Sequence, residues 1–183
     1  MTQIQVTEKA QRYLNLLDTA RCNQNWHEIP GLVRKIIKHA PDRKRLIQTV
    51  EAESQIVEYC KKRTSIGSAA NEQSANNLRE CIPKLQSVLE EEQNTPQDAF
   101  QTQVCLAWLF WELSEPDEVT ASLPEDFETT VQSLTGSEQS LSPWTEVCIV
   151  QGGYLKGAAE ELTSGKEDAL RTFKSSFSWA ATP

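Results

Sequence analysis

The chain has 183 residues, of which 38% are hydrophobic and 24% are charged, and its net charge is −8 at pH 7. This composition is ordinary for a globular domain or a short solenoid, and no run approaches the roughly 18 apolar residues of a membrane-spanning helix. The N-terminus lacks the apolar core of a signal peptide. The five cysteines form no C-x-x-C pair, so we expect free, buried or half-buried thiols in a cytoplasmic protein.

Charge is unevenly distributed along the chain. Residues 31–63 contain nine Lys or Arg against four Asp or Glu, whereas residues 85–155 contain thirteen Asp or Glu and no Lys or Arg. Such a long acidic stretch repels nucleic-acid phosphate, and the basic region lacks interleaved aromatic side chains for base stacking. We therefore expect no nucleic-acid partner.

Residues 13–41 predict a complete helical hairpin. Two apolar stripes at helical spacing flank the turn-forming Asn23-Gln24-Asn25, and a proline ends the second helix. This pattern matches the 34-residue tetratricopeptide repeat. The positions of the repeat core are Tyr13, Leu16, Leu17 and Ala20 in the first helix, Ile29, Val33 and Ile36 in the second, and the closing Pro41. Leu32 and Ile37 extend the apolar face of the second helix. Large residues replace several usual small ones, so the repeat is degenerate, and an ordinary amphipathic hairpin is the alternative.

A long helix with basic ends follows Pro41. Its expected inner face is Leu46, Val50, Val57 and Cys60, with Arg43, Lys44 and Arg45 at one end and Lys61, Lys62 and Arg63 at the other. These charges form either a surface for an acidic partner or anionic lipid, or an ordinary solvated face. The residues that we expect to bind a partner are Trp26, Arg34, Lys35, Lys38, Arg43, Lys44 and Arg45.

The second half of the chain predicts further helices after a linker at residues 64–75. Pro83 requires a kink or a helix start near Cys81 or Ile82. Residues 96–113 predict a central helix that is apolar on most sides. Residues 114–143 are expected to be an acidic loop with one short helix at about 125–134. The domains are thus residues 1–63, the linker 64–75, and a helical-repeat continuation over 76–183.

Two C-terminal helices complete the expected architecture. Ser142-Pro143-Trp144 predicts a helix start, and Gly152 and Gly153 predict a close approach of a neighbouring helix. The inner residues of this helix are expected to include Val147, Cys148, Tyr154, Leu155, Ala159 and Leu162, and those of the last helix Ala169, Leu170, Phe173 and Phe177. Phe173, Phe177 and Trp179 are a poor cap for a solenoid, so we expect a fragment of a longer one that dimerises or aggregates. The fold class is therefore all-α, with hairpins stacked as a short α-solenoid.

No catalytic or metal-binding motif stands out. The two histidines, His27 and His39, have no carboxylate or cysteine at metal-ligand spacing, and no G-x-S-x-G, Walker or H-E-x-x-H motif occurs. We expect neither enzymatic activity nor a cofactor, although an enzyme is kept as the alternative from another functional class.

The sequence W-H-E-I-P-G-L-V-R-K-I-I-K-H-A-P-D-R, with the preceding L-D-x-A-R-C, resembles the N-terminal region of the tetratricopeptide repeat protein seven family, which includes fungal cargo-transport and filamentation proteins. The resemblance is strong over about residues 10–60 and loose beyond. It implies a scaffold that holds phosphatidylinositol 4-kinase type III alpha at the plasma membrane with a lipid-anchored partner, and a role in endocytic cargo transport. It also implies recruitment to the membrane only through proteins.

A second adaptor class is weighed against this resemblance. Co-chaperone adaptors with tetratricopeptide repeats clamp an acidic peptide C-terminus with a Lys and an Asn from the first helix. The equivalent positions here are Leu14 and Asp18. These residues disfavour a clamp.

Overall fold

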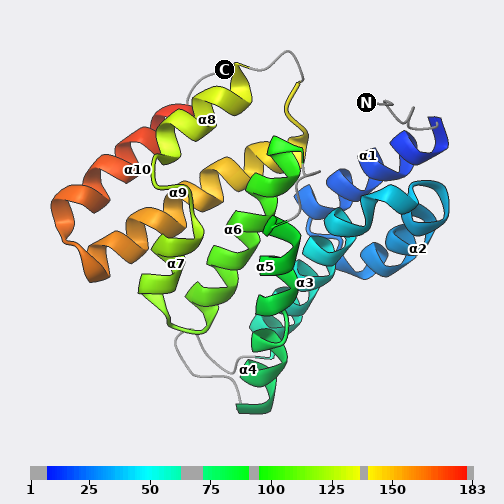
Figure 1. Cartoon of the computed structure of the whole chain (residues 1–183), viewed down its shortest axis with the longest axis horizontal. Coiled ribbons are helices and arrows are strands. Elements are labelled where there is room, and N and C mark those ends of the chain that lie inside the picture. The colour runs from blue at the N-terminus through cyan, green and yellow to red at the C-terminus, as the bar shows by residue number, and fades with distance from the viewer. Residues whose placement is uncertain (1–7, 63–71, 91–94, 137–139, 181–183) are drawn as a thin grey trace.

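The computed structural model describes residues 8–62, 72–90, 95–136 and 140–180, with side chains up to Ser176. Every regular element in these ranges is helical (Figure 1). The α-helices are α1 (Glu8–Cys22), α2 (Ile29–His39), α3 (Lys44–Lys61), α4 (Glu72–Arg79), α5 (Ile82–Glu90), α6 (Pro96–Glu112), α7 (Pro116–Ser122), α8 (Phe127–Thr135), α9 (Pro143–Thr163) and α10 (Lys166–Ala180). Two 3₁₀ turns, η1 (Trp26–Glu28) and η2 (Pro41–Arg43), precede α2 and α3. The prediction of an all-α protein is confirmed.

Helix α6 lies at the centre of the molecule. It packs against α3, α5, α7 and α9, while α9 also contacts α1, α7 and α10 (Figure 1). The contact between α1 and α9 joins the first hairpin to the last pair of helices. In an open solenoid each repeat contacts only its neighbours. The described helices therefore gather around α6, and the expected open stack is not confirmed.

Three helices end in the same kind of turn. A residue with positive φ follows α1, α6 and α9: Gln24 at 58°, Ser114 at 61° and Gly165 at 115°. After α1 and α6, the N–H of the residue that follows the positive-φ residue donates to a carbonyl in the last helical turn, for example from Asn25 to Ala20 at 2.8 Å. After α9, the N–H of Gly165 itself makes this bond. These bonds satisfy carbonyls that the helix leaves unpaired. The chain then reverses into the pairs α1–α2, α6–α7 and α9–α10.

Two hydrophobic clusters form the core. The N-terminal cluster consists of buried residues of α1, α2 and the first half of α3, such as Leu17, Ile36 and Val50. The main cluster comprises buried residues from the second half of α3 through α9, among them Phe100 and Leu109. Trp26 is half-buried and packs against both clusters.

The predicted repeat core is correct for most of its positions and wrong for Leu16. Leu17, Ala20, Ile29, Val33 and Ile36 are buried, and Tyr13 is half-buried. Leu16 is 42% exposed, because the stripe of α1 that faces the core runs instead through Ala10, Leu14, Leu17 and Arg21. Pro41 ends α2 as expected, but it is exposed at the start of η2.

Several apolar residues expected inside lie at the surface. Ile37 is 51% exposed. The residues of α9 and α10 that are also exposed are Val147, Tyr154, Leu162 and Leu170, because they lie away from the buried side of each helix. Cys148, Leu155, Ala159 and Ala169 are buried as expected. In α3 the buried stripe includes Ile47, Ile56 and Tyr59, so Val57 and Cys60 are only half-buried. The side chains of Phe177 and Trp179 lie outside the described residues.

Element boundaries in the second half show one further error. Residues 114–143 were expected to form a loop with one short helix, but they contain both α7 and α8. Their apolar residues Val119, Leu123, Phe127, Val131 and Leu134 are buried in the main cluster, which gives these short helices their stability. Of the expected linker, residues 72–75 belong to α4, and residues 64–71 lie outside the described ranges. The predicted helix start at Ile82 is confirmed.

Candidate functional site

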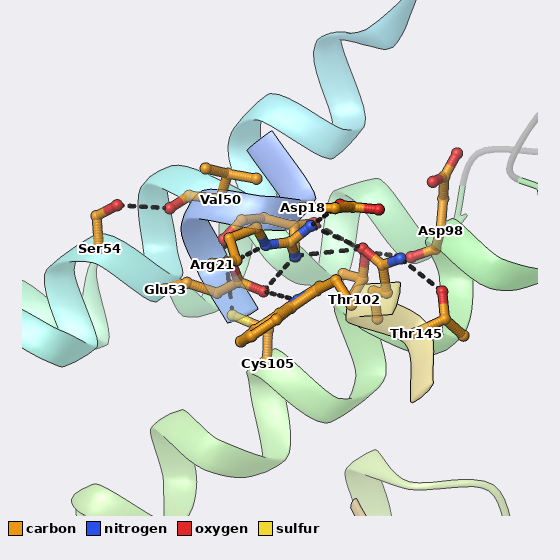
Figure 2. Close-up of polar contacts among 12 residues, drawn as sticks. Asp18, Arg21, Val50, Glu53, Ser54, Asp98, Thr102, Cys105 and Thr145 are labelled. Carbon is orange, nitrogen blue, oxygen red and sulfur yellow. Dashed lines mark hydrogen bonds and ion pairs between the residues drawn. The ribbon is translucent and has the colours of Figure 1, made fainter. Parts of the chain in front are cut away.

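A buried polar network joins four helices where the two hydrophobic clusters meet. Arg21 of α1, only 1% exposed, lies at its centre (Figure 2). Its Nε donates to Glu53 Oε2 of α3 at 2.9 Å, and its Nη2 donates to Glu53 Oε1 at 2.6 Å. Both terminal nitrogens also donate to Gln101 Oε1 of α6 at 3.2 Å. Nη1 reaches Asp18 Oδ1 at 3.4 Å.

Residues of α9 close the network. The Trp144 ring lies under the guanidinium, with its centroid 4.6 Å from Arg21 Cζ. The Trp144 Nε1–H donates to Glu53 Oε1 at 3.1 Å, and Gln101 Nε2 donates to Thr145 Oγ1 at 2.9 Å. The five guanidinium N–H groups therefore all have acceptors. Burial alone would lower the pKa of Arg21, but the attraction of Glu53, its hydrogen bonds and the nearby Cys148 and Asp18 together outweigh burial, so the pKa lies above its ordinary value.

This network is structural rather than catalytic in its chemistry. A guanidinium with all donors engaged cannot polarise or hold a substrate without breaking these bonds. The nearby Cys105 and Cys148 are also inert, because burial raises the pKa of both thiols and keeps them protonated. The expectation that every cysteine is at least half-buried is wrong for Cys22, which is exposed. No disulfide joins the cysteines, all of which lie in the described ranges.

Sequence reasoning missed this network, although a signal for it was present. Arg21 continues the stripe of Ala10, Leu14 and Leu17 on α1, and Glu53 continues the stripe of Leu46 and Val50 on α3. A charged residue at a core position of one helix predicts an opposite charge at a core position of another, because an unpaired buried charge is costly.

The predicted partner-binding residues do not form one surface. Arg34, Lys35, Lys38 and Lys44 are exposed, and we call them, with Ile37, the basic surface. Lys35 Nζ lies 5.5 Å from the centroid of the Tyr13 ring. Arg43 instead turns toward α6, where its Nη1 donates to Asp98 Oδ2 at 2.9 Å.

Two other members of the predicted set are also less accessible than expected. Arg45 is half-buried. Trp26 is half-buried as well, and it packs edge-on against Trp144 with ring centroids 6.1 Å apart. The expectation that Trp26 is an exposed binding residue is therefore wrong, because its ring fills the junction between the two hydrophobic clusters.

The titratable groups outside the network were also compared with the ligand sets of metal sites. Within the described ranges, no group of three or more His, Cys, Asp or Glu side chains is placed to hold a metal ion. The imidazole of His39 stacks on Tyr13 with ring centroids 5.5 Å apart, and the side chain of His27 is 79% exposed. None of the helices in the described part of the chain is long and apolar enough to cross a membrane.

The chain was compared with protein-family models, with curated proteins and with solved structures, and none of them matches it.

Proposed function

We propose that the protein is a non-catalytic scaffold or adaptor built from degenerate helical-repeat hairpins, and that it acts through its basic surface. The observation that carries this proposal is that Arg34, Lys35 and Lys38 are exposed on α2 together with the apolar Ile37, while the other face of this helix is packed in the N-terminal cluster. An exposed mixture of positive charge and apolar area is suited to docking of an acidic partner.

The matching helix ends support the repeat interpretation. A residue with positive φ lies between the two helices of each of the pairs α1–α2, α6–α7 and α9–α10, and in the first two pairs Leu17 and Ala107 lie seven residues before it. Both side chains are fully buried. Equivalent core positions at equal distances from equivalent turns are expected of a diverged repeat. The stack would then close through the contact of α1 with α9 rather than continue as an open superhelix.

The proposed partner comes from the sequence resemblance. The segment that resembles the tetratricopeptide repeat protein seven family, about residues 10–60, contains the whole basic surface. We therefore propose that the protein helps to assemble phosphatidylinositol 4-kinase with its membrane anchor at the plasma membrane, and so supports endocytic cargo transport in fungi. Its own contact with the membrane would be indirect.

The co-chaperone alternative has less support. A clamp for an acidic C-terminus needs cations or amides at the positions of Leu14 and Asp18. Leu14 instead packs against the N-terminal cluster, and Asp18 contributes negative charge. An enzyme is also the weaker proposal, because the buried polar groups described above are engaged with one another.

The proposal is tested by affinity capture from fungal lysate with the full chain as bait. We expect recovery of phosphatidylinositol 4-kinase or its membrane anchor. The double variant Arg34→Glu/Lys38→Glu should reduce the captured amount by about tenfold or more, because the reversed charges repel an acidic partner. The matched control is Lys84→Glu/Lys174→Glu, which reverses two exposed charges outside the basic surface and should retain capture.

Two outcomes would count against the proposal. Recovery of chaperones without the kinase or its anchor would favour the co-chaperone alternative. Equal capture by both double variants would show that the basic surface is not the docking site.

A further inference from the structure

A polar cleft opens beside the buried network. It has a volume of about 480 Å³ and lies between α1, the start of α3, the start of α6 and the segment that leads into α9. Its polar lining includes Gln11, Asn15, Asp18, Arg43, Gln97 and Asp98. Clefts where two packed units meet are common sites for small ligands. This cleft is separate from the basic surface, which shares no residue with its lining.

The charges around the cleft do not balance. Arg43 is paired with Asp98 at 2.9 Å, and Arg21 is paired with Glu53 at 2.6 Å. Asp18 has a longer contact of 3.4 Å with Arg21, whose charge Glu53 already balances, and a hydrogen bond with the side chain of Ser142, which is neutral. Among the described residues around the cleft, one carboxylate is therefore in excess, and the Asp18 side chain is only 17% exposed. In Figure 2 this carboxylate lies beyond the tip of Arg21, on the same side as Asp98.

The amide side chains that line the cleft already have partners, which leaves the Asp18 carboxylate as the charged acceptor for a ligand. The amides of Gln11 and Asn15 already bond to each other, from Nε2 to Oδ1 at 2.9 Å, and form a polar rim. Gln97 is held in place by the Ser142 N–H and the Thr145 hydroxyl, both of which donate to its Oε1. An anion would meet the excess negative charge of Asp18, whereas a cation would neutralise it.

We propose that the cleft binds the ammonium or guanidinium group of a ligand, with Asp18 as its counter-ion. The group could be carried by a free amine or by a Lys or Arg side chain of a peptide, and the chemistry at Asp18 is the same for both. Burial raises the pKa of Asp18, against the attraction of Arg21 and the hydrogen bond with Ser142, and a bound cation would stabilise the charged carboxylate.

The test uses the full ¹⁵N-labelled chain, two small probes of matched size and one peptide. We expect n-butylammonium to shift the side-chain amide resonances of Gln11, Asn15 and Gln97 saturably, while n-butanol leaves them unchanged. The peptide Ac-Gly-Lys-Gly-NH₂ separates the two sources. Tighter binding of the peptide assigns the site to basic side chains, and tighter binding of n-butylammonium assigns it to free amines.

Variants test the role of the carboxylate. Asp18→Asn keeps the shape of the side chain and should weaken binding of the cation by about tenfold or more, because a charge-assisted contact becomes a neutral one. Asp117→Asn, an exposed aspartate of α7 outside the cleft, should bind as the wild type does. Asn15→Lys places an ammonium group at the rim from an exposed position and should block binding without disturbing the core. An equal response to n-butanol, or undiminished binding by Asp18→Asn, would overturn the proposal.

Discussion

At the scale of single residues, Arg21 and Glu53 are the charged pair on which the junction of the four helices depends. Each of them is 1% exposed. Removing one member of a buried ion pair leaves the other without compensation, which is far more costly than losing an exposed pair. The stability of this junction therefore depends on complete pairing rather than on the number of hydrogen bonds.

We predict that Glu53→Gln lowers the free energy of unfolding by about 3 to 5 kcal/mol, since the charge of Arg21 stays buried. The control is Glu58→Gln on the same helix, which breaks only an exposed contact of 3.3 Å with Lys61 and should change stability by less than about 0.5 kcal/mol. Urea unfolding followed by tryptophan fluorescence measures both. Similar small losses in the two variants would contradict the proposed importance of the pair.

At the scale of elements, the pair α9–α10 shows how a weak helix former is retained for packing. Gly153 lies in the middle of α9, where a glycine costs about 1 kcal/mol relative to alanine. A methyl group added there would lie 2.6 Å from the Cβ of Ser176 on α10. The close approach of a neighbouring helix predicted from the Gly152-Gly153 pair is confirmed. Helix α10 approaches Gly153, and helices α6 and α8 approach Gly152.

We predict opposite effects for two glycine-to-alanine substitutions in helices. Gly153→Ala should destabilise the protein by about 1 to 3 kcal/mol, because α10 must move away. The methyl group added by Gly31→Ala in α2 would have no atom within 4 Å. This substitution should stabilise the protein by about 0.5 to 1 kcal/mol, because alanine has a higher helix propensity than glycine. Thermal unfolding of the two variants provides the comparison. A stabilised Gly153→Ala would mean that α10 does not pack closely on α9.

At the scale of the whole molecule, the N-terminal cluster and the main cluster are connected through few apolar side chains. The polar network of Arg21 fills part of their junction, and Trp26 is the side chain that packs against both clusters in the described residues. Regions of a protein that share little apolar contact can open separately. The hairpin of α1 and α2 is thus the unit most easily detached from α6 and α9.

We predict that Trp26→Ala lowers stability by about 2 kcal/mol and raises amide hydrogen exchange in α1 and α2 more than in α6. Trp108→Ala is the matched control, because Trp108 is also half-buried but packs against the main cluster alone. It should not raise exchange selectively in α1 and α2. Hydrogen-exchange mass spectrometry resolves the helices, and a uniform change in both variants would show that the two clusters open together.

The sequence alone determined the local structure. Periodic apolar residues, the cap at Ser142 and the prolines at helix starts fixed the all-α class, the hairpin of α1 and α2, and the start of α5, because these signals act within a few residues of one another. The short helix predicted at about 125–134 is α8, whereas α7 was missed because its stability comes from burial against α6 and α9 rather than from local propensity.

Only the tertiary structure decided which face of each helix is covered and which charges are paired. Leu16 and Ile37 lie on apolar stripes yet are exposed, whereas Arg21 and Glu53 are buried. The sequence spacing cannot reveal that residues 21, 53, 101 and 144 meet, because their hydrogen-bonded pairs lie 32 to 91 positions apart and are brought together only by the packing of four helices. For the same reason the sequence did not reveal that Arg43, which was expected at the surface, pairs with Asp98. The cleft around Asp18 likewise exists only in the folded chain.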